Sequence, residues 1–244
     1  MKAVLGRAAA LPLAPLLLWQ GRRVRRVTPR LPEATGPRAG RRPGQGAPLR
    51  LLVVGDSSAA GVGVTRSSQA LIGQLLDQLA AQTARPLVWR VVARTGVTTE
   101  EARALLEASP AEPFDVAVVA LGVNDVTALH PARRWRAAVA RLQTTLIQRH
   151  QVKAVLWSGL PPMHRFPALP QPLRAVLGLH ARGLDQELAH FCRSAGKGAV
   201  RTMHVSMPDL QAQGFIAADG FHPGRAAYRL WAQTLAPVVL AQAG

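Results

Sequence analysis

The sequence is poor in several residue types, and each shortage excludes a class of protein. A single cysteine, Cys192, excludes an intrachain disulfide and any metal site built from several cysteines. The cleanest apolar run, residues 8–19, has about twelve residues, whereas a membrane-spanning helix needs roughly 20. Internal repeats and nucleic-acid-binding motifs are absent. The length of 244 residues suits one domain with a tail, and 48% hydrophobic residues can form its core.

Acidic residues are scarce as well, and the resulting positive charge is unevenly distributed. Thirteen Asp and Glu residues stand against 30 Lys and Arg residues, which gives a net charge of +17. Residues 1–50 contain eleven basic residues and one acidic residue, Glu33, whereas the other 194 contain nineteen and twelve. Such a charge permits contact with anionic lipid or nucleic acid. Because no nucleic-acid motif accompanies it, we expect no specific nucleic-acid partner.

Residues 1–27 form an apolar segment followed by a basic one. The arginine-rich run 21–26 comes after the apolar residues, and no small-residue cleavage site follows, so the segment differs from a signal peptide. Two interpretations remain: residues 1–26 anchor the protein on an anionic membrane surface, or they pack on the domain. A basic cluster at this position favours a cytoplasmic or membrane-associated location over secretion. Residues 28–48, rich in Pro, Gly and Arg, are expected to be a linker.

From residue 49 to residue 244, strand and helix patterns alternate. Apolar, β-branched runs predict strands at 51–54, 87–93, 114–121, 152–158 and 198–204, and longer segments predict helices at 69–82, 98–106, 132–149, 173–194 and 225–241. Thr98 precedes Glu101 by three residues, which is typical of a capping box. Strands separated by helices pair in parallel through right-handed crossovers. We therefore predict one α/β domain, a three-layer α/β/α sandwich around a five-stranded parallel sheet.

The stretch 51–63 places one serine where such sheets bind ligands. A short buried strand, a tight turn and a helix bring Ser57 to the carboxyl end of the sheet. The usual Gly-x-Ser-x-Gly elbow is absent, because Ala59 stands where its second glycine would be. Serines in turns more often cap helices or bond their own backbone. A catalytic role for Ser57 therefore depends on what the rest of the chain supplies.

Three further places follow strands or precede the last helix, namely Gly96, Asn124 and the stretch 219–224, and they converge with Ser57 in the predicted sheet. His222 can serve as the base for a serine hydroxyl, and Asp219, three residues earlier, can fix the tautomer of its ring. An acyl-transfer intermediate carries an oxyanion, for which the donors would be the backbone N–H groups of Ser57 and Gly96 and the side-chain amide of Asn124. One such donor typically contributes about 3 kcal/mol to transition-state stabilisation.

These residues occur in four short motifs whose order along the chain is characteristic. They are Gly55-Asp56-Ser57, the isolated Gly96, Gly122-Val123-Asn124-Asp125 and Asp219-Gly220-Phe221-His222. Over about residues 50–240 the sequence resembles the SGNH hydrolase, or GDSL-type esterase/lipase, family. The resemblance implies an acyl-enzyme mechanism on esters without a metal or another cofactor. It also implies a flavodoxin-like strand order, 2-1-3-4-5.

Other polar residues near the motifs are expected to support the site. We expect Asp56 to accept backbone hydrogen bonds and Asp125 to support the turn of Asn124. Ser58 stands where the family commonly has leucine and is expected to face packing. His164, in a loop that should overhang the site, is a candidate for substrate contact. The other histidines (His130, His150, His180, His190 and His204) lack a partner at motif spacing and are expected at the surface or in packing.

The sequence thus predicts a serine esterase that acts on a small-molecule ester or a lipid. Both lipase-like or lysophospholipase-like substrates and short-chain acyl esters fit this prediction. A carbohydrate O-deacetylase would use the same residues, with only the pocket differing. The alternative that is not an enzyme is a membrane-associated binding protein, which has kept the hydrolase fold without useful turnover.

Overall fold

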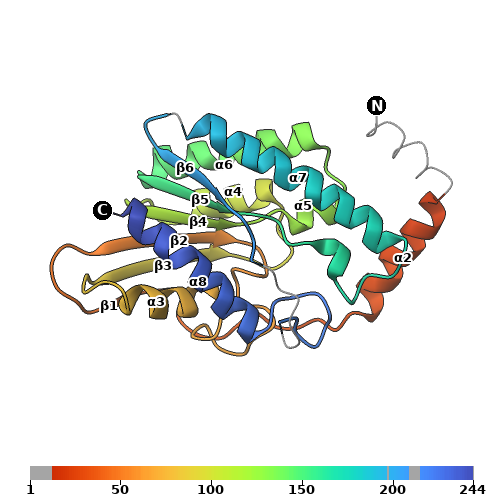
Figure 1. Ribbon diagram of the computed structural model, residues 1–244, viewed down its shortest axis with the longest axis horizontal. Coiled ribbons are helices and arrows are strands. Elements are labelled where there is room, and N and C mark those ends of the chain that lie inside the picture. Colours follow the sequence, from red (N-terminus) through yellow and green to blue (C-terminus); the bar gives the residue numbers. More distant parts are fainter. Residues whose placement is uncertain (1–12, 197, 209–214, 244) are drawn as a thin grey trace.

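A computed structural model describes residues 13–196, 198–208 and 215–243, and its centre is a six-stranded sheet (Figure 1). The strands are β1 (Ala39–Arg42), β2 (Leu49–Gly55), β3 (Leu87–Ala93), β4 (Val116–Ala120), β5 (Ala154–Ser158) and β6 (Arg201–Val205). Their order across the sheet is β1-β3-β2-β4-β5-β6. The strands β2 to β6 are parallel to one another, and β1 pairs antiparallel with β3. The 2-1-3-4-5 order of the five parallel strands is confirmed, but the sheet has six strands rather than the predicted five, because β1 is added at its edge.

Helices connect successive parallel strands, and a final helix follows β6. They are α3 (Leu71–Ala80), α4 (Thr99–Ala108), α5 (Val123–Thr127), α6 (Ala132–His150), α7 (Leu173–Ala195) and α8 (Arg225–Gln242), with a 3₁₀ turn η1 (Met163–Arg165) before α7. The capping box is present at the start of α4, where the Thr98 hydroxyl accepts from Glu101 N–H and the Glu101 carboxylate accepts from Thr98 N–H. This reciprocal pair satisfies two of the donors that a helix start leaves without partners, so α4 begins where its sequence predicts.

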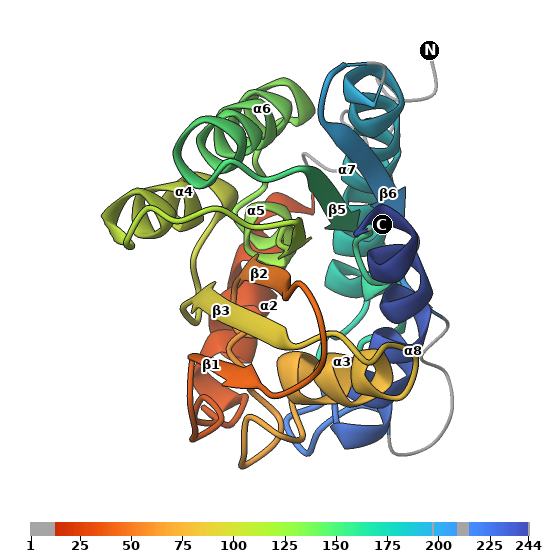
Figure 2. The ribbon, with the colours of Figure 1, turned by 90° about the vertical axis from the view of Figure 1, so that its left-hand side faces the viewer.

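The sheet separates two apolar clusters, because side chains alternate between its faces. Figure 2 shows α4 and α6 on one side of the sheet and α3 and α8 on the other. On β2, Leu52 and Val54 face the cluster that contains α4, α6 and α7, whereas Leu51 and Val53 face the cluster that contains α3 and α8. All four side chains are at most 1% exposed. Full burial of one such side chain contributes about 1.5–3 kcal/mol, so both layers hold the central strands firmly in place.

One strand lies in the segment that the sequence predicted to be a linker. The pairing places Ala39 opposite Arg90 and Arg42 opposite Leu87. Gly40 lies under Trp89, since a Cβ there would be 2.5 Å from the indole ring. The linker prediction is therefore wrong for residues 39–42. The sequence of this segment has no strand pattern, but its backbone forms hydrogen bonds with the unpaired backbone groups at the edge of β3.

The N-terminal segment contains the helix α2 (Ala14–Val27), and residues 1–12 of the predicted anchor lie outside the described residues. Leu17 and Val24 pack against the cluster that includes α7. Buried Gln20 donates to Gln171 O (2.7 Å) and accepts from Leu173 N–H (3.1 Å). The inner face of α2 therefore packs on the domain. Within the described ranges, no helix combines the length and the apolar character that crossing a bilayer requires.

Candidate active site

Ser57, His222 and Asp219 form a hydrogen-bonded chain at the carboxyl end of the sheet. Ser57 follows the end of β2 by two residues, and its Oγ lies 3.0 Å from His222 Nε2. His222 Nδ1 lies 2.5 Å from Asp219 Oδ2. The other oxygen of Asp219 accepts two backbone N–H groups, from Phe221 and from His222, each at 3.0 Å. With its proton on Nδ1, the imidazole presents the lone pair of Nε2 to the serine hydroxyl.

The environment of Asp219 favours its ionised form. Burial by itself raises the pKa of this carboxyl, but the hydrogen bonds from the His222 ring and from the backbone N–H groups of His222 and Phe221 oppose it. The hydrogen bonds prevail, and the pKa of Asp219 lies below its ordinary value. Asp219 is therefore a carboxylate at neutral pH, as the partner of a ring that becomes positively charged should be.

Two contacts fix the distance between the loop of Ser57 and the loop of His222. Gly63 has a φ of +101°, and a Cβ on it would lie 2.2 Å from Pro223 O, so only glycine lets the two backbones approach this closely. The buried hydroxyl of Tyr228, on α8, donates to Val62 O at 2.7 Å. Both contacts link the segment just after Ser57 to the segment just after His222.

Asp56 and Ser58 flank the candidate nucleophile and bond to each other. Asp56 Oδ1 accepts from Ser58 N–H (3.0 Å) and from the Ser58 hydroxyl (2.9 Å). Burial raises the pKa of Asp56 above its ordinary value, although both bonds from Ser58 oppose the rise. The expectation that Ser58 faces packing was wrong, because the buried carboxylate next to it draws its hydroxyl into the turn, where it also lines the cavity described below.

The candidate oxyanion donors lie in three loops at this edge. Asn124 Nδ2 donates to Val97 O at 2.9 Å and lies 3.5 Å from Asp56 Oδ2, so its side chain joins the loops that follow β2 and β3. Gly96, with a φ of +83°, is exposed in the turn just before Val97. Among the described residues, no acceptor is bonded to the N–H of Ser57 or of Gly96. Both groups are therefore unoccupied donors.

Asp125 connects the loop of Asn124 to the start of α4. Its buried carboxylate accepts from Thr99 N–H (3.0 Å) and from the Thr99 hydroxyl (2.8 Å), and Thr99 in turn accepts from Trp135 Nε1 (3.0 Å). The second oxygen of Asp125 bonds His130 Nδ1 at 2.9 Å. His130 therefore has a carboxylate partner that motif spacing did not reveal.

His204 has one as well, since its Nε2 lies 2.8 Å from Asp185 Oδ1. The same oxygen accepts from Leu160 N–H (2.9 Å), so Asp185 holds the start of the loop that follows β5. These two residues lie 19 positions apart on α7 and β6, and nothing in the local sequence marks them as a pair.

His164 is away from the other candidates. It lies in η1 against α7, where a Cβ added to Gly178 would come within 2.5 Å of the Cβ of His164. Its Nδ1 is buried without a partner among the described residues, and burial lowers the pKa of the ring. His164 does not line the cavity next to Ser57. The structure therefore gives no support to the expected substrate contact.

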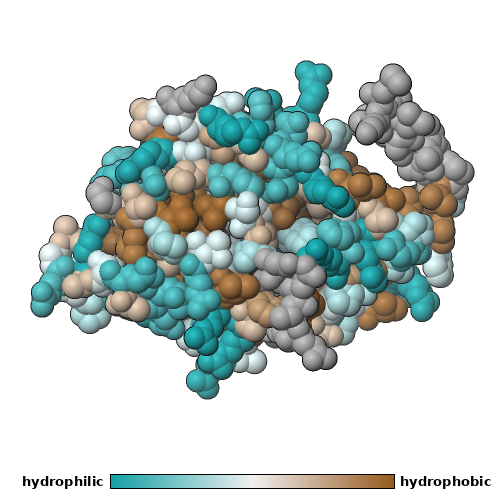
Figure 3. Space-filling view, in the orientation of Figure 1, coloured by the Kyte–Doolittle hydropathy of each residue, from teal (hydrophilic) through white to brown (hydrophobic). Residues whose placement is uncertain are grey.

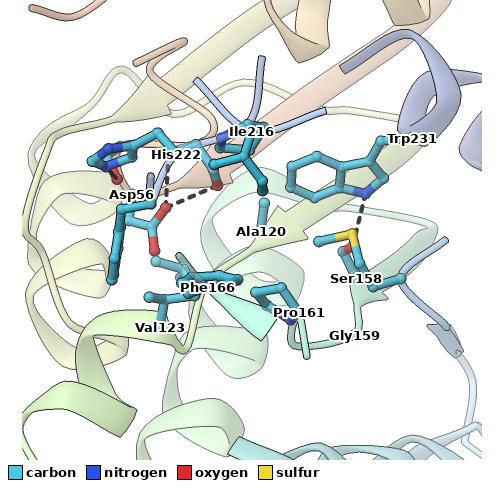
Figure 4. A pocket seen from close by; sticks show the side chains of 16 residues that line it. Asp56, Ala120, Val123, Ser158, Gly159, Pro161, Phe166, Ile216, His222 and Trp231 are labelled. Carbon is cyan, nitrogen blue, oxygen red and sulfur yellow. Dashed lines mark hydrogen bonds between the residues drawn. The ribbon is translucent and has the colours of Figure 1, made fainter. Parts of the chain in front are cut away.

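A cavity of about 50 Å³ extends from Ser57 and His222 (Figure 4). Trp231 and Ser158 lie at its far end, where Trp231 Nε1 donates to Ser158 Oγ at 2.9 Å. Most of its other described lining side chains are apolar: Ala120, Leu121, Val123, Pro161, Phe166, Met207, Ile216, Phe221 and Pro223. Sequence reasoning placed the loop of Pro161 and Phe166 over the site but missed the rest of this lining. The end of β5 marks Ser158 as a residue at the ligand-binding edge, but no local signal identifies Trp231.

No group of three or more potential metal ligands occurs in the part of the chain that the structure describes. The sequence model of the GDSL-like lipase/acylhydrolase family matches residues 53–230. The chain belongs to this family. It is 32% identical over 200 residues to a GDSL-like esterase of Mycobacterium tuberculosis, an alignment that covers 77% of this chain and 60% of that protein. The chain thus spans about three fifths of that relative.

Solved structures show that the family fold is shared widely at low sequence identity. The crystal structure of TesA is 20% identical, with a TM-score of 0.60, and the match covers 79% of this chain and 99% of that one. An acetylxylan esterase from Geobacillus stearothermophilus is 16% identical, with a TM-score of 0.55, and the match covers 82% and 96%. At these identities the likeness establishes the SGNH hydrolase fold and leaves the substrate open.

Proposed function

We propose that this GDSL-family chain is a serine esterase that forms an acyl-enzyme, with Ser57 as nucleophile, His222 as general base and acid, and Asp219 as the group that orients His222. The observation that supports it most is the unbroken chain from Ser57 Oγ through both ring nitrogens of His222 to Asp219. A binding protein without turnover has no need of this arrangement.

The proposed reaction balances without a metal or another cofactor. Ser57 Oγ attacks the carbonyl carbon of the ester while His222 Nε2 takes the hydroxyl proton. The oxyanion of the tetrahedral intermediate receives hydrogen bonds from Ser57 N–H, Gly96 N–H and the Asn124 amide. Collapse breaks the bond to the alcohol, which leaves with the proton from His222. Water then attacks the acyl-enzyme with His222 again as base, which releases the acid and restores Ser57.

The size and lining of the cavity favour esters of short acyl groups. A water-sized group needs about 10–15 Å³ of such a cavity. The cavity volume of about 50 Å³ therefore holds roughly four groups of that size. Trp231 and Ser158 close the far end, and apolar side chains line the sides. We therefore propose acyl chains of about two to four carbons. Acetyl esters of larger alcohols, including acetylated sugars, belong to this class.

The experiment compares p-nitrophenyl esters of two to twelve carbons in the wild type, in Ser57→Ala and in a control variant, Ser68→Ala, whose serine is exposed in another loop. We expect turnover of the short esters by the wild type and the control, and none by Ser57→Ala. Full activity in folded Ser57→Ala protein would refute the mechanism. A preference for chains of eight or more carbons would refute the short-acyl proposal and leave the mechanism standing.

A further inference from the structure

The outward face of α2 combines exposed apolar side chains with unpaired arginines. Leu18 and Trp19 are 60% and 57% exposed, and Arg22, Arg25 and Arg26 follow at the helical spacings that keep them on the same side. These five residues are called the α2 outer face. Figure 3 shows hydrophobic surface over α2 at the end of the molecule. Such exposure of a tryptophan and a leucine beside charged groups is unusual for a surface that meets only water.

The α2 outer face is held in position by the opposite side of the same helix. Leu17 and Val24 pack against the core cluster of α7, and both polar atoms of the Gln20 side chain bond backbone groups near the start of α7. The helix therefore does not need to fold or turn when it meets a partner. Its outer face is preformed, and Leu18 and Trp19 point away from the domain.

The charges of α2 have no counterpart in the described part of the protein. The helix contains four arginines and no acidic residue, and no ion pair is formed by Arg22, Arg23, Arg25 or Arg26 with any described residue. Glu33, the only acidic residue among residues 1–50, is bonded to Arg38 and Thr95 instead. The guanidinium of Arg23 lies 5.7 Å from the centre of the Trp19 ring. A partner that neutralises these arginines must be an anion.

We propose that the α2 outer face docks the protein on the surface of an anionic phospholipid bilayer. Leu18 and Trp19 would enter the boundary between headgroups and acyl chains, where tryptophan is favoured, and the arginines would meet the lipid phosphates. A second copy of the chain would bring the same arginines against one another in a symmetric interface. Nucleic acid would meet the arginines but leave Leu18 in water. Anionic lipid satisfies both halves of the face.

The helix that carries the docking surface is bonded to the end of a loop that also lines the cavity. Gln20 bonds the backbone of Gln171 and Leu173, which end the loop that carries Pro161 and Phe166 of the cavity wall. Figure 1 shows α2 beside the start of α7, at one end of the molecule. Docking through α2 would therefore bring the cavity near the membrane surface. The proposal concerns binding alone and does not depend on whether Ser57 is a nucleophile.

Intrinsic fluorescence and vesicle sedimentation test the proposal with the full chain. Trp19 is the most exposed of the five tryptophans, because Trp89 is half-buried and Trp135, Trp157 and Trp231 are buried. We expect phosphatidylglycerol-containing vesicles to shift the emission to the blue and to sediment the protein, and 0.5 M salt to reverse both effects. Pure phosphatidylcholine vesicles should do neither. Trp19→Phe should lose most of the emission change.

Two arginine variants of equal charge give the decisive comparison. Replacing Arg22, Arg25 and Arg26 by Gln should weaken vesicle binding about 100-fold, at roughly fivefold for each arginine near the surface. The matched control replaces the exposed Arg133, Arg134 and Arg136 of α6 by Gln and should change binding less than tenfold. Equal loss in both variants would assign binding to net charge and refute the α2 outer face.

A leucine variant separates the membrane from a second copy of the chain. Leu18→Ser should lower vesicle binding while leaving the hydrolysis of a water-soluble ester and the thermal unfolding temperature unchanged. Vesicle binding unchanged in Leu18→Ser would refute the proposal. A dimer of the wild type that dissociates in Leu18→Ser would also refute it, because the face would then be an interface between copies. A wild type that binds vesicles yet shows no ester turnover would support docking and refute only the proposed function.

Discussion

Replacing Asp219 by asparagine should abolish nearly all activity without disturbing the fold. Asp219 Oδ1 accepts two backbone N–H groups, from Phe221 and from His222. In Asp219→Asn the side-chain oxygen must stay at these two donors, so the amide NH₂ takes the place of Oδ2 and faces His222 Nδ1. An NH₂ group donates a hydrogen bond, which forces the ring proton onto Nε2. Nε2–H then faces Ser57 and cannot take its proton.

The expected loss in kcat is about 10⁴-fold, as for the same exchange in a serine protease triad. At 1.36 kcal/mol for each factor of ten, this loss corresponds to about 5 kcal/mol of transition-state stabilisation. KM should change little, because Asp219 does not line the cavity. Initial rates over a series of p-nitrophenyl butyrate concentrations give kcat and KM. Circular dichroism and thermal unfolding report on the fold.

Asp77→Asn is the matched control, since Asp77 lies on the exposed side of α3 in an ion pair with Arg42. It should keep the kcat of the wild type. A folded Asp219→Asn variant with a kcat within tenfold of the wild type would refute the proposed role of the Asp219–His222 pair.

Three further variants test the surroundings of the site and of the core. Ser58→Ala removes one of the two hydrogen bonds that Ser58 donates to buried Asp56 and should lower the free energy of unfolding by about 1 kcal/mol in urea denaturation; an unchanged value would contradict this contribution. Burial holds the pKa of His150 below 6.5, so as the pH falls the unfolded chain takes up a proton on this ring before the folded protein does, and the free energy of unfolding should decrease below pH 6.5. Between pH 7.5 and 5.5, urea unfolding should therefore show a smaller decrease in the free energy of unfolding for His150→Gln than for the wild type. An equal decrease in both would exclude His150 as the cause. Trp231→Phe removes roughly one ring from the side chain at the far end of the cavity, and the space that this leaves should lengthen the preferred acyl chain by about one or two carbons. An unchanged chain-length profile of ester hydrolysis would show that Trp231 does not limit the length of the acyl chain.

The sequence predicted those parts of the fold that local patterns determine. The parallel strands follow from apolar runs between helix-length segments, and the start of α4 follows from Thr98 and Glu101, three residues apart. The strand β1 escaped prediction because Ala39-Gly40-Arg41-Arg42 has no alternation of its own. It is a strand because β3 offers unpaired backbone groups and because Gly40 leaves room for Trp89. Only the tertiary structure contains that information.

The site divides in the same way. Ser57, Asn124, Asp219 and His222 could be found because each lies in a short motif next to a strand or before the last helix. Contacts between distant segments could not, and the bond between Trp231 and Ser158 joins residues 73 positions apart. Sequence spacing placed His164 in a loop near the site, but it could not reveal that the backbone and Cβ of His164 pack against Gly178 of α7.

The most direct test of Ser57 as nucleophile is covalent labelling with a fluorophosphonate ester, followed by peptide mapping of the wild type, Ser57→Ala and His222→Ala. We expect one adduct in the wild type, on Ser57, no adduct in Ser57→Ala, and labelling of His222→Ala slowed by at least about 100-fold, because the base that activates the hydroxyl is gone. An adduct on another residue, or labelling of Ser57 that proceeds equally fast without His222, would contradict the proposed mechanism.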